Sequence, residues 1–217
     1  MNDSAGANPP RTLAIDIGGT GLKASVLDEA GKMETKRARV PTPSPCSPEI
    51  LLAVVEKLVE PLPAYDRISI GFPGVVRDGG IITAPHFADK AWLGYPLETA
   101  IASRLGKPAR LLNDAEVQGL GIIAGQGLEV VLTLGTGVGS AVFINGALTP
   151  HLELAHHPIR KDETYNEYLG NAANIVVPLP DKVQIASNDA GLTGGIRLWD
   201  DDIWKSVCGG REASPVH

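Results

Sequence analysis

The amino-acid sequence predicts an α/β fold, and three observations support this class. Short apolar runs that end at glycines or polar residues are typical of buried strands. Segments with apolar residues at helical spacing lie between several of these runs. A strand–glycine turn–strand unit occurs twice, in "DIGGTGLKASV" and in "LGTGVGSAVFI". The 217 residues are enough for one sizeable domain, or for two small lobes that share a cleft.

The first part of the chain is expected to open as a β-meander. Apolar runs over residues 13–17 and 22–27 flank the first glycine turn, and residues 33–40 form the expected third strand. A helix is expected over residues 49–60, because its apolar residues recur at helical spacing and Ser47 is a suitable N-cap.

Strands and helices are expected to alternate through the rest of the chain. The segments "RISIGF" and "ARLLND" predict strands, and the second of these ends in polar residues. The segment "VVLTLGTGVGSAVFINGALTP" predicts two apolar strands around the second glycine turn, with a hairpin turn at Asn145 and Gly146. We also expect helices over 95–105 and 115–124, a short strand over 182–187, and a helix start in "NDAGLTGGIRLW".

Composition limits the partners and the compartment of the protein. A net charge of −6 and a pI of about 5.4 argue against nucleic acid or an anionic membrane as the main partner. Cys46 and Cys208 stand outside any Cys/His cluster, which favours two free thiols in a reducing compartment. With no apolar run of spanning length and no signal-like start, we expect a cytoplasmic protein with a disordered arm over residues 1–10 and a flexible tail over residues 201–217.

The glycine turns do not match the helix-led phosphate sites. A dinucleotide-binding turn is followed by a helix, whereas β-tolerant residues follow these glycines, and "GGTGLKAS" lacks the spacing of a P-loop. A β-hairpin remains, in which glycine permits positive φ and a close approach of phosphate to the backbone. Thr20 and Thr136 would add hydroxyl donors. The alternative is two ordinary hairpins, but Asp16 just before the first turn favours phosphate binding.

Five segments together resemble the ROK family (repressors, uncharacterised reading frames and sugar kinases) of the actin-like, hexokinase-like superfamily. "AIDIGGTGLKASVLD" resembles its first phosphate motif, "LLNDAEVQGLG" its catalytic Asn-Asp segment and "LTLGTGVGSAVFINGAL" its second phosphate motif. "LELAHHP" is similar to the Glu-x-Gly-His sugar-binding stretch, with Ala155 in place of glycine. "SNDAGLTGGIRLW" resembles the C-terminal region of the glucokinase and polyphosphate-glucokinase branch.

The resemblance implies an actin-like (ribonuclease H-like), two-lobed kinase fold with mixed sheets. Residues 11–112 would form the N-terminal lobe and residues 113–200 the C-terminal lobe, each with one phosphate hairpin. The cysteine-rich zinc segment of the family is absent, as in the polyphosphate-glucokinase branch. After "YNEYLGNAA" a helix-plus-strand connection of roughly 30 residues is missing, so the second lobe is expected to be truncated.

The resemblance also implies roles for individual residues. Asp114 would be the general base that accepts the proton of the sugar's primary hydroxyl. Asn113 would hydrogen-bond another hydroxyl, although "ND" also reads as a plain helix cap. The other expected sugar contacts are Glu153, His156, Gly74 and Glu167, with Asn166 as the alternative to Glu167.

The donor side would combine a hydrated metal with the two glycine turns. Asp16 would orient Mg²⁺ through water, because this ion keeps much of its hydration. Lys23 would either neutralise phosphate charge or be a solvated strand lysine. The expected phosphate-binding residues are Gly18, Gly19, Thr20, Gly21, Lys23, Gly135, Thr136 and Gly137.

The resulting hypothesis is a glucokinase-like enzyme that transfers a phosphoryl group from ATP or polyphosphate to the 6-hydroxyl of glucose or a similar hexose. A degenerate, non-catalytic sugar-binding protein is the alternative, because of the missing connection. A transcriptional repressor is not expected, since about ten residues before the first strand are too few for a helix-turn-helix. The superfamily often forms dimers, which leaves a homodimer open.

Overall fold

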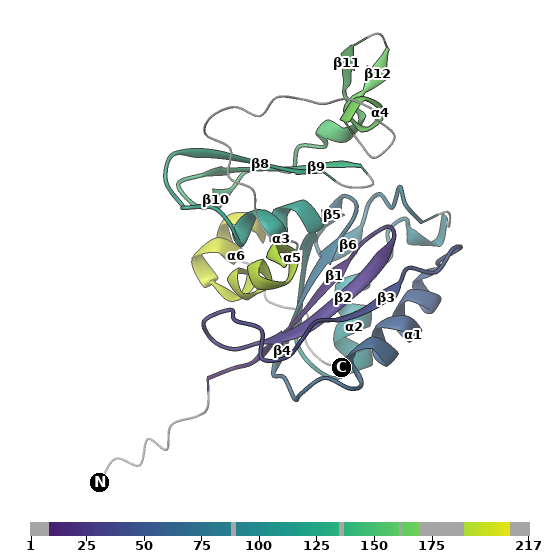
Figure 1. Ribbon diagram of the computed structural model, residues 1–217, viewed down its shortest axis with the longest axis vertical. Helices are drawn as coiled ribbons and strands as arrows, with labels where there is room; N and C mark the ends of the chain where they lie inside the picture. Colours follow the sequence, from purple (N-terminus) through teal and green to yellow (C-terminus); the bar gives the residue numbers. More distant parts are fainter. Residues whose placement is uncertain (1–8, 88–89, 135–136, 161, 170–188, 209–217) are drawn as a thin grey trace.

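The computed structural model describes residues 9–87, 90–134, 137–160, 162–169 and 189–208. These residues form a central five-stranded sheet with helices on both faces, and a second, smaller sheet beyond one helical layer (Figure 1). The predicted strand over residues 182–187 lies outside the described residues.

The central sheet has the strand order β3-β2-β1-β4-β7 and is mixed. β1, β2 and β3 run antiparallel, whereas β4 and β7 run parallel to β1. The predicted meander is confirmed, but its third strand starts later than expected, because Met33 makes only an isolated bridge to Leu27. The strands are β1 (Thr12–Ile17), β2 (Gly21–Leu27), β3 (Ala38–Pro41), β4 (Arg67–Phe72) and β7 (Ala109–Asn113).

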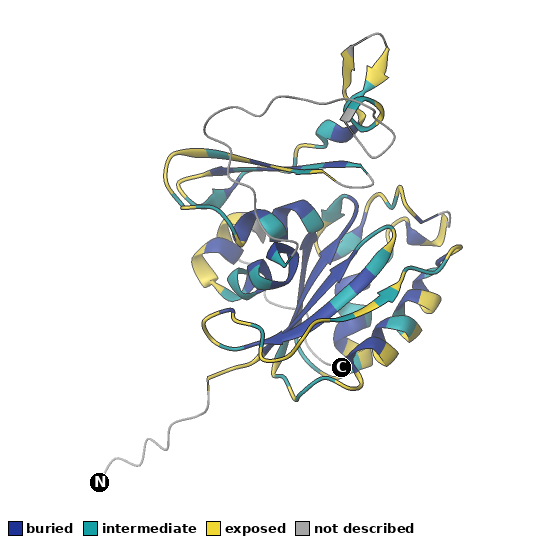
Figure 2. Cartoon of the chain, in the orientation of Figure 1, coloured by how far each residue is buried: buried dark blue, intermediate teal, exposed yellow. Residues whose placement is uncertain are grey.

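Two helices, α1 (Pro48–Val59) and α2 (Leu97–Leu105), pack on one face of this sheet (Figure 1). The predicted cap of α1 is confirmed, since the Ser47 hydroxyl accepts a hydrogen bond from the Ile50 N–H at 3.4 Å. Apolar side chains of both helices join those of the strands in the largest buried cluster, and β1, β4 and β7 are largely dark blue in Figure 2. This burial makes the sheet a rigid base for residues at its strand ends.

The opposite face is covered by α3 (Asp114–Leu120), α5 (Ala190–Thr193) and the 3-10 helix η3 (Gly194–Trp199). The Ser69 hydroxyl of β4 donates to the Gly195 carbonyl at 2.6 Å and accepts from the Trp199 indole N–H at 3.0 Å. Residues 190–199, which the sequence analysis assigned to the C-terminal lobe, therefore also pack against the sheet of the N-terminal lobe.

The second sheet is antiparallel, with the order β10-β9-β8. β8 (Leu128–Leu134) and β9 (Val138–Ile144) pair along their whole length, and β10 (Ala147–Leu148) follows the predicted hairpin turn. That turn is confirmed, because Asn145 and Gly146 both have positive φ, as a tight hairpin turn requires. In the described part of the chain β8 is an edge strand, and one of its faces carries exposed leucine and valine side chains.

Short elements complete the structure. The predicted flexible tail is wrong for residues 201–208, because these form α6 (Asp201–Cys208) and bury Ile203 and Trp204 against the second core cluster. Among the described residues no helix is long and apolar enough to cross a membrane. The other short elements are β5 (Val76–Arg77), β6 (Gly80–Ile81), η1 (Lys90–Trp92), η2 (Leu154–His156), β11 (Pro158–Arg160), β12 (Glu163–Thr164) and α4 (Tyr165–Leu169).

Candidate active site

A cavity of about 280 Å³ lies between the first glycine turn, the N-terminus of α3, and the segments around β9 and η2. Residues from both predicted lobes line it, although they are up to about 150 positions apart in the sequence. Of the predicted site residues, those in the lining are Gly18, Gly19, Thr20, Lys23, Gly74, Asn113, Asp114, Gly137, Glu153 and His156.

The first glycine turn connects β1 to β2 at one wall of this cavity. The Gly18 N–H donates to the Gly21 carbonyl at 3.0 Å, and the Thr42 hydroxyl donates to the Gly18 carbonyl at 2.6 Å. Glycine is needed here for space and not for positive φ, which corrects the expectation from the sequence. A Cβ atom on Gly19 would lie 2.8 Å from Cγ of His86, closer than real Cβ contacts allow.

Asn113 acts as the N-cap of α3. Its side-chain oxygen accepts the Ala115 N–H at 2.9 Å, and the Glu116 carboxylate accepts the Asn113 N–H at 3.2 Å, which completes a capping box. Its amide nitrogen donates to the Gly74 carbonyl at 3.0 Å. Because these bonds occupy both ends of the amide, the helix-cap interpretation describes Asn113 in this structure. The cap fixes the next residue, Asp114, at the first position of the helix.

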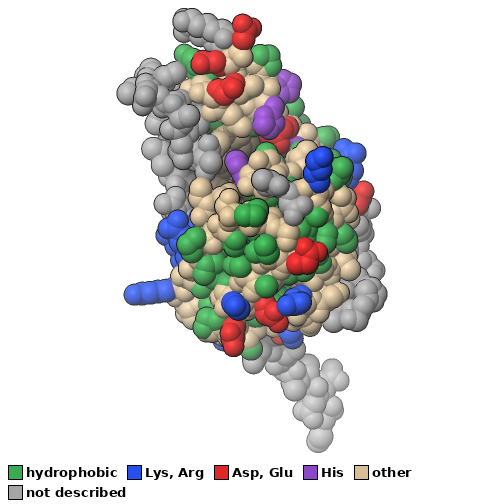
Figure 3. All heavy atoms as spheres, turned by 90° about the vertical axis from the view of Figure 1, so that its right-hand side faces the viewer, with side chains coloured by type: hydrophobic (Ala, Val, Ile, Leu, Met, Phe, Trp, Pro, Cys, Tyr) green, Lys and Arg blue, Asp and Glu red, His purple; other side chains and the backbone are tan. Residues whose placement is uncertain are grey.

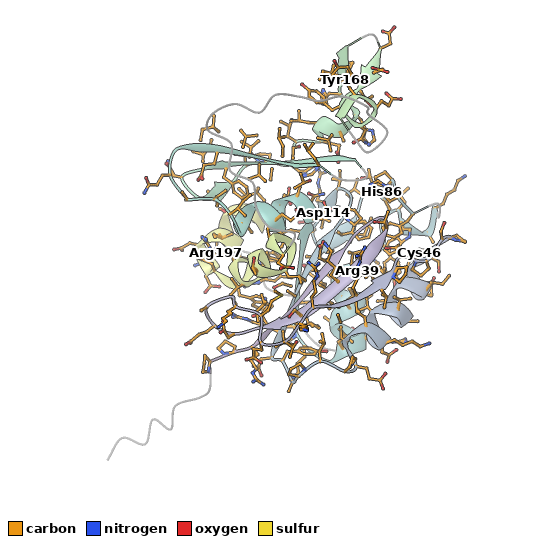
Figure 4. The ribbon with its side chains drawn as sticks, in the orientation of Figure 1. Arg39, Cys46, His86, Asp114, Tyr168 and Arg197 are labelled. Atoms are coloured by element: carbon orange, nitrogen blue, oxygen red, sulfur yellow. The ribbon has the colours of Figure 1, made fainter. Side chains whose placement is uncertain are left out.

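Asp114 points toward the cavity from the start of α3 (Figure 4). Burial and, to a smaller extent, the nearby Asp16 carboxylate raise the pKa of its carboxyl to about 7, although a hydrogen bond from the Ala115 N–H partly opposes the shift. A carboxylate whose pKa lies near neutrality can take up a proton from a hydroxyl and release it again. The geometry and the pKa of Asp114 therefore suit a general base.

Asp16 lies at the end of β1 and is 6% exposed. The described residues contain no cluster of three His, Cys, Asp or Glu side chains that could chelate a bare ion. The two carboxylates of Asp16 and Asp114 repel each other, and a cation near them would relieve this repulsion. Since Mg²⁺ binds through few protein ligands and several waters, these residues fit a hydrated ion held through water.

Glu153 and His156, at the two ends of η2, also line the cavity. A hydrogen bond from His151 lowers the pKa of Glu153, so this carboxylate is ionised and can accept hydrogen bonds from hydroxyl groups. His86 and His156 both line the cavity, and histidine side chains gather in the upper part of the face in Figure 3. Burial of His86 lowers its pKa, with a further contribution from His156.

The predicted Glu167 does not line the cavity. Its carboxylate is exposed and accepts hydrogen bonds from the N–H and the hydroxyl of Thr164, at 2.8 and 2.9 Å. The neighbouring Asn166 lines the cavity instead, and its side-chain oxygen accepts the Val138 N–H at 2.7 Å. A Cβ atom on Gly137 would lie 2.8 Å from that same oxygen, so the glycine leaves room for Asn166.

Another predicted phosphate-binding residue, Gly21, is not in the lining. Gly21 starts β2 just behind the turn, and a Cβ atom there would lie 3.4 Å from the Arg39 guanidinium, which is labelled in Figure 4. Gly135 and Thr136 lie outside the described residues. Lys23 is not a simple solvated lysine, because its side chain is partly buried and lies against Asp16.

Sequence reasoning missed four residues at or near the site. His86 and Gln118 line the cavity, Arg39 adjoins the first glycine turn, and His151 contacts Glu153. A helical spacing of four from Asp114 could have revealed Gln118, and the pairing of strands could have placed Arg39 opposite Lys23. Nothing in the local sequence around His86 marks its contact with Gly19, which depends on the fold.

The ROK family matches residues 12–158, and the chain belongs to this family. It is 35% identical over 164 residues to the polyphosphate glucokinase of Mycobacterium tuberculosis (strain ATCC 25177 / H37Ra), covering 71% of this chain and 62% of that relative. The expectation of a shortened second lobe accords with this coverage.

Solved structures of the family have the same fold. The inorganic polyphosphate/ATP-glucomannokinase from Arthrobacter sp. strain KM matches with a TM-score of 0.68 and 35% identity, covering 76% of this chain and 70% of that chain. A ROK family glucokinase from Streptomyces griseus, in complex with glucose and AMPPNP, matches with a TM-score of 0.63 and 26% identity, covering 75% of this chain and 58% of that chain. The predicted actin-like fold with mixed sheets is confirmed.

Proposed function

We propose that this protein is a sugar kinase that transfers a phosphoryl group from ATP or polyphosphate to the 6-hydroxyl of glucose or a similar hexose. The observation that carries the proposal is the position of Asp114. It lies at the start of a capped helix, in one cavity with the first glycine turn and with Glu153 and His156. The similarity to polyphosphate glucokinase and to a polyphosphate/ATP-glucomannokinase supports the substrate class.

In the proposed reaction the sugar's primary hydroxyl oxygen attacks the terminal phosphorus, and Asp114 accepts the proton of that hydroxyl. Glu153 and His156 bind other hydroxyls and orient the ring. Asn113 acts through its cap, which fixes Asp114. Gly74 supports the same cap, because its carbonyl accepts the Asn113 amide. Asn166 takes the place that the sequence analysis assigned to Glu167.

The donor phosphates would lie at the first glycine turn, with Gly137 on the other side of the cavity. Lys23 supplies positive charge next to the turn, and the guanidinium of Arg39 adds a second positive charge behind it. Mg²⁺, when bound through water near Asp16, would neutralise charge on the transferring phosphoryl group. A cytoplasmic location is proposed with this function because ATP is available there. The formation of a homodimer stays a prediction.

A coupled assay for glucose 6-phosphate tests the proposal. Purified protein is given glucose and Mg²⁺ with ATP or with polyphosphate, and Asp114→Asn is compared with the exposed control Asp202→Asn. We expect turnover in the native protein and in the control, and a loss of about 10²-fold or more in Asp114→Asn. The donor that supports turnover shows whether the protein acts as a glucokinase that uses ATP or as a polyphosphate glucokinase.

The alternative function, a non-catalytic sugar-binding protein, makes a different prediction. It is favoured by the coverage, since the chain spans 62% of the length of the M. tuberculosis relative. Folded protein that binds glucose in calorimetry but turns over with neither donor would refute the kinase proposal and support this alternative.

A further inference from the structure

His151 lies between two carboxylates that belong to different parts of the site. Its Nδ1 is 2.8 Å from Oε1 of Glu116, and its Nε2 is 3.3 Å from Oε2 of Glu153. Both ring nitrogens therefore face acceptors, which the doubly protonated imidazolium satisfies. The two hydrogen bonds raise the pKa of His151 to about 9, so the ring is charged at neutral pH.

The hydrogen bonds of His151 extend to the proposed base. Glu116 uses its second oxygen, Oε2, to accept the Asn113 N–H at 3.2 Å. Asn113 caps α3, and Asp114 is the first residue of that helix. A continuous chain of polar contacts thus runs from Glu153, beside the proposed sugar position, through His151 and Glu116 to the N-terminus of α3.

We propose that His151 is a positioning residue that fixes the Glu153 carboxylate relative to Asp114 and thereby sets the affinity of the site for the sugar. This inference rests on the proposed sugar kinase function. His151 does not line the cavity that holds Asp114, so it acts through Glu153 and Glu116 and does not touch the sugar.

The Glu153 side chain has room for a second orientation when His151 is removed. A second cavity of about 550 Å³ lies next to the first, and Glu153 lines both. Glu116 and His151 also line the second cavity, together with Arg77 and Asp78 of the β5–β6 hairpin. Without the imidazolium, the carboxylates of Glu116 and Glu153 repel each other across an open space. Glu153 would then turn away from the sugar.

Kinetics of His151→Ala in the full chain test the inference, with His157→Ala as the matched control. His157 is an exposed histidine six residues further along, outside both cavity linings. We expect the KM for glucose to rise by about tenfold in His151→Ala, as for the loss of a charge-assisted hydrogen bond. The KM for the donor should change little, whereas the melting temperature should fall, because the hydrogen bonds that raise the pKa of His151 also stabilise the folded protein. We also expect His151→Gln, which keeps a side-chain donor, to recover part of the glucose affinity.

Other outcomes would overturn the inference. An unchanged KM for glucose would show that Glu153 needs no support from His151. Equal changes in the KM for glucose and the KM for the donor would show a purely structural role. If His151→Ala does not fold, the same criteria apply to His151→Gln, for which a KM for glucose equal to that of the native protein together with a lowered melting temperature counts against the inference.

The failure of the proposed function can be separated from the failure of this inference. Native protein without turnover refutes the kinase proposal, and glucose binding by calorimetry then replaces the KM. Weaker glucose binding in His151→Ala than in His157→Ala would still support the positioning role. Equal binding in the two variants, or no binding by the native protein, would overturn it.

Discussion

Lys23 and Asp16 form an ion pair across the first two strands of the central sheet. They are direct partners in the antiparallel pairing of β1 and β2, and Lys23 Nζ lies 3.1 Å from Asp16 Oδ2. Lys23 also lines the cavity, whereas the Asp16 carboxylate is nearly buried behind it. The pairing register thus holds the ammonium group of Lys23 at the glycine turn where the donor phosphates are proposed to bind.

We predict that Lys23→Met raises the KM for the phosphoryl donor and lowers kcat, each by about tenfold. The substitution removes a positive charge beside the proposed phosphate position and leaves Asp16 without its partner. Lys57→Met, an exposed change on α1, is the control and should have little effect. Initial rates at saturating glucose, over a range of donor concentrations, measure the change. A donor KM equal to that of the control would contradict the prediction.

Asp114→Asn is predicted to stabilise the metal-free protein at pH 8 while it abolishes activity. The carboxyl has a folded-state pKa of about 7 against an ordinary value of 3.8, so the folded state binds its proton more tightly than the unfolded state does. The contribution of Asp114 to stability is therefore largest below pH 4 and is lost as the pH rises to about 7. An uncharged asparagine avoids that loss.

The expected gain at pH 8 is on the order of 2 to 4 kcal/mol in the free energy of unfolding. At pH 4 the native protein and Asp114→Asn should differ much less. Urea unfolding at both pH values, with EDTA present, provides the measurement. Equal stabilities at pH 8 would mean that the carboxyl is not buried as strongly as the structure indicates.

Asn166 and Glu167 provide a test of the register of α4. We predict that Asn166→Ala raises the KM for glucose several-fold, because Asn166 lines the cavity and holds the start of β9 through the Val138 N–H. Glu167→Ala should leave this KM unchanged, since its exposed carboxylate accepts hydrogen bonds from Thr164 and does not line the cavity. Each variant serves as the control of the other. The reverse result would restore Glu167 as the sugar contact.

Much of the central fold can be predicted from the sequence because local patterns and tertiary packing agree there. Apolar runs beside the first glycine turn become β1 and β2, and Ser47 caps α1 as expected. Where local and tertiary preferences differ, the prediction fails. The polar-looking segment after Trp199 forms α6, because Ile203 and Trp204 find an apolar cluster that the local sequence does not reveal.

The sequence by itself determined the family, the two hairpins and the identity of the candidate base, because these depend on short motifs whose residues are neighbours in the chain. Only the tertiary structure decided which side chains meet. It placed Asn166, and not Glu167, in the lining of the cavity. It also showed that Gly19 is needed for space beside His86, and that His151 contacts Glu116, which lies 35 residues earlier. The physical reason is that hydrogen bonds and steric fit between distant segments depend on how the elements pack, and no local pattern records that packing.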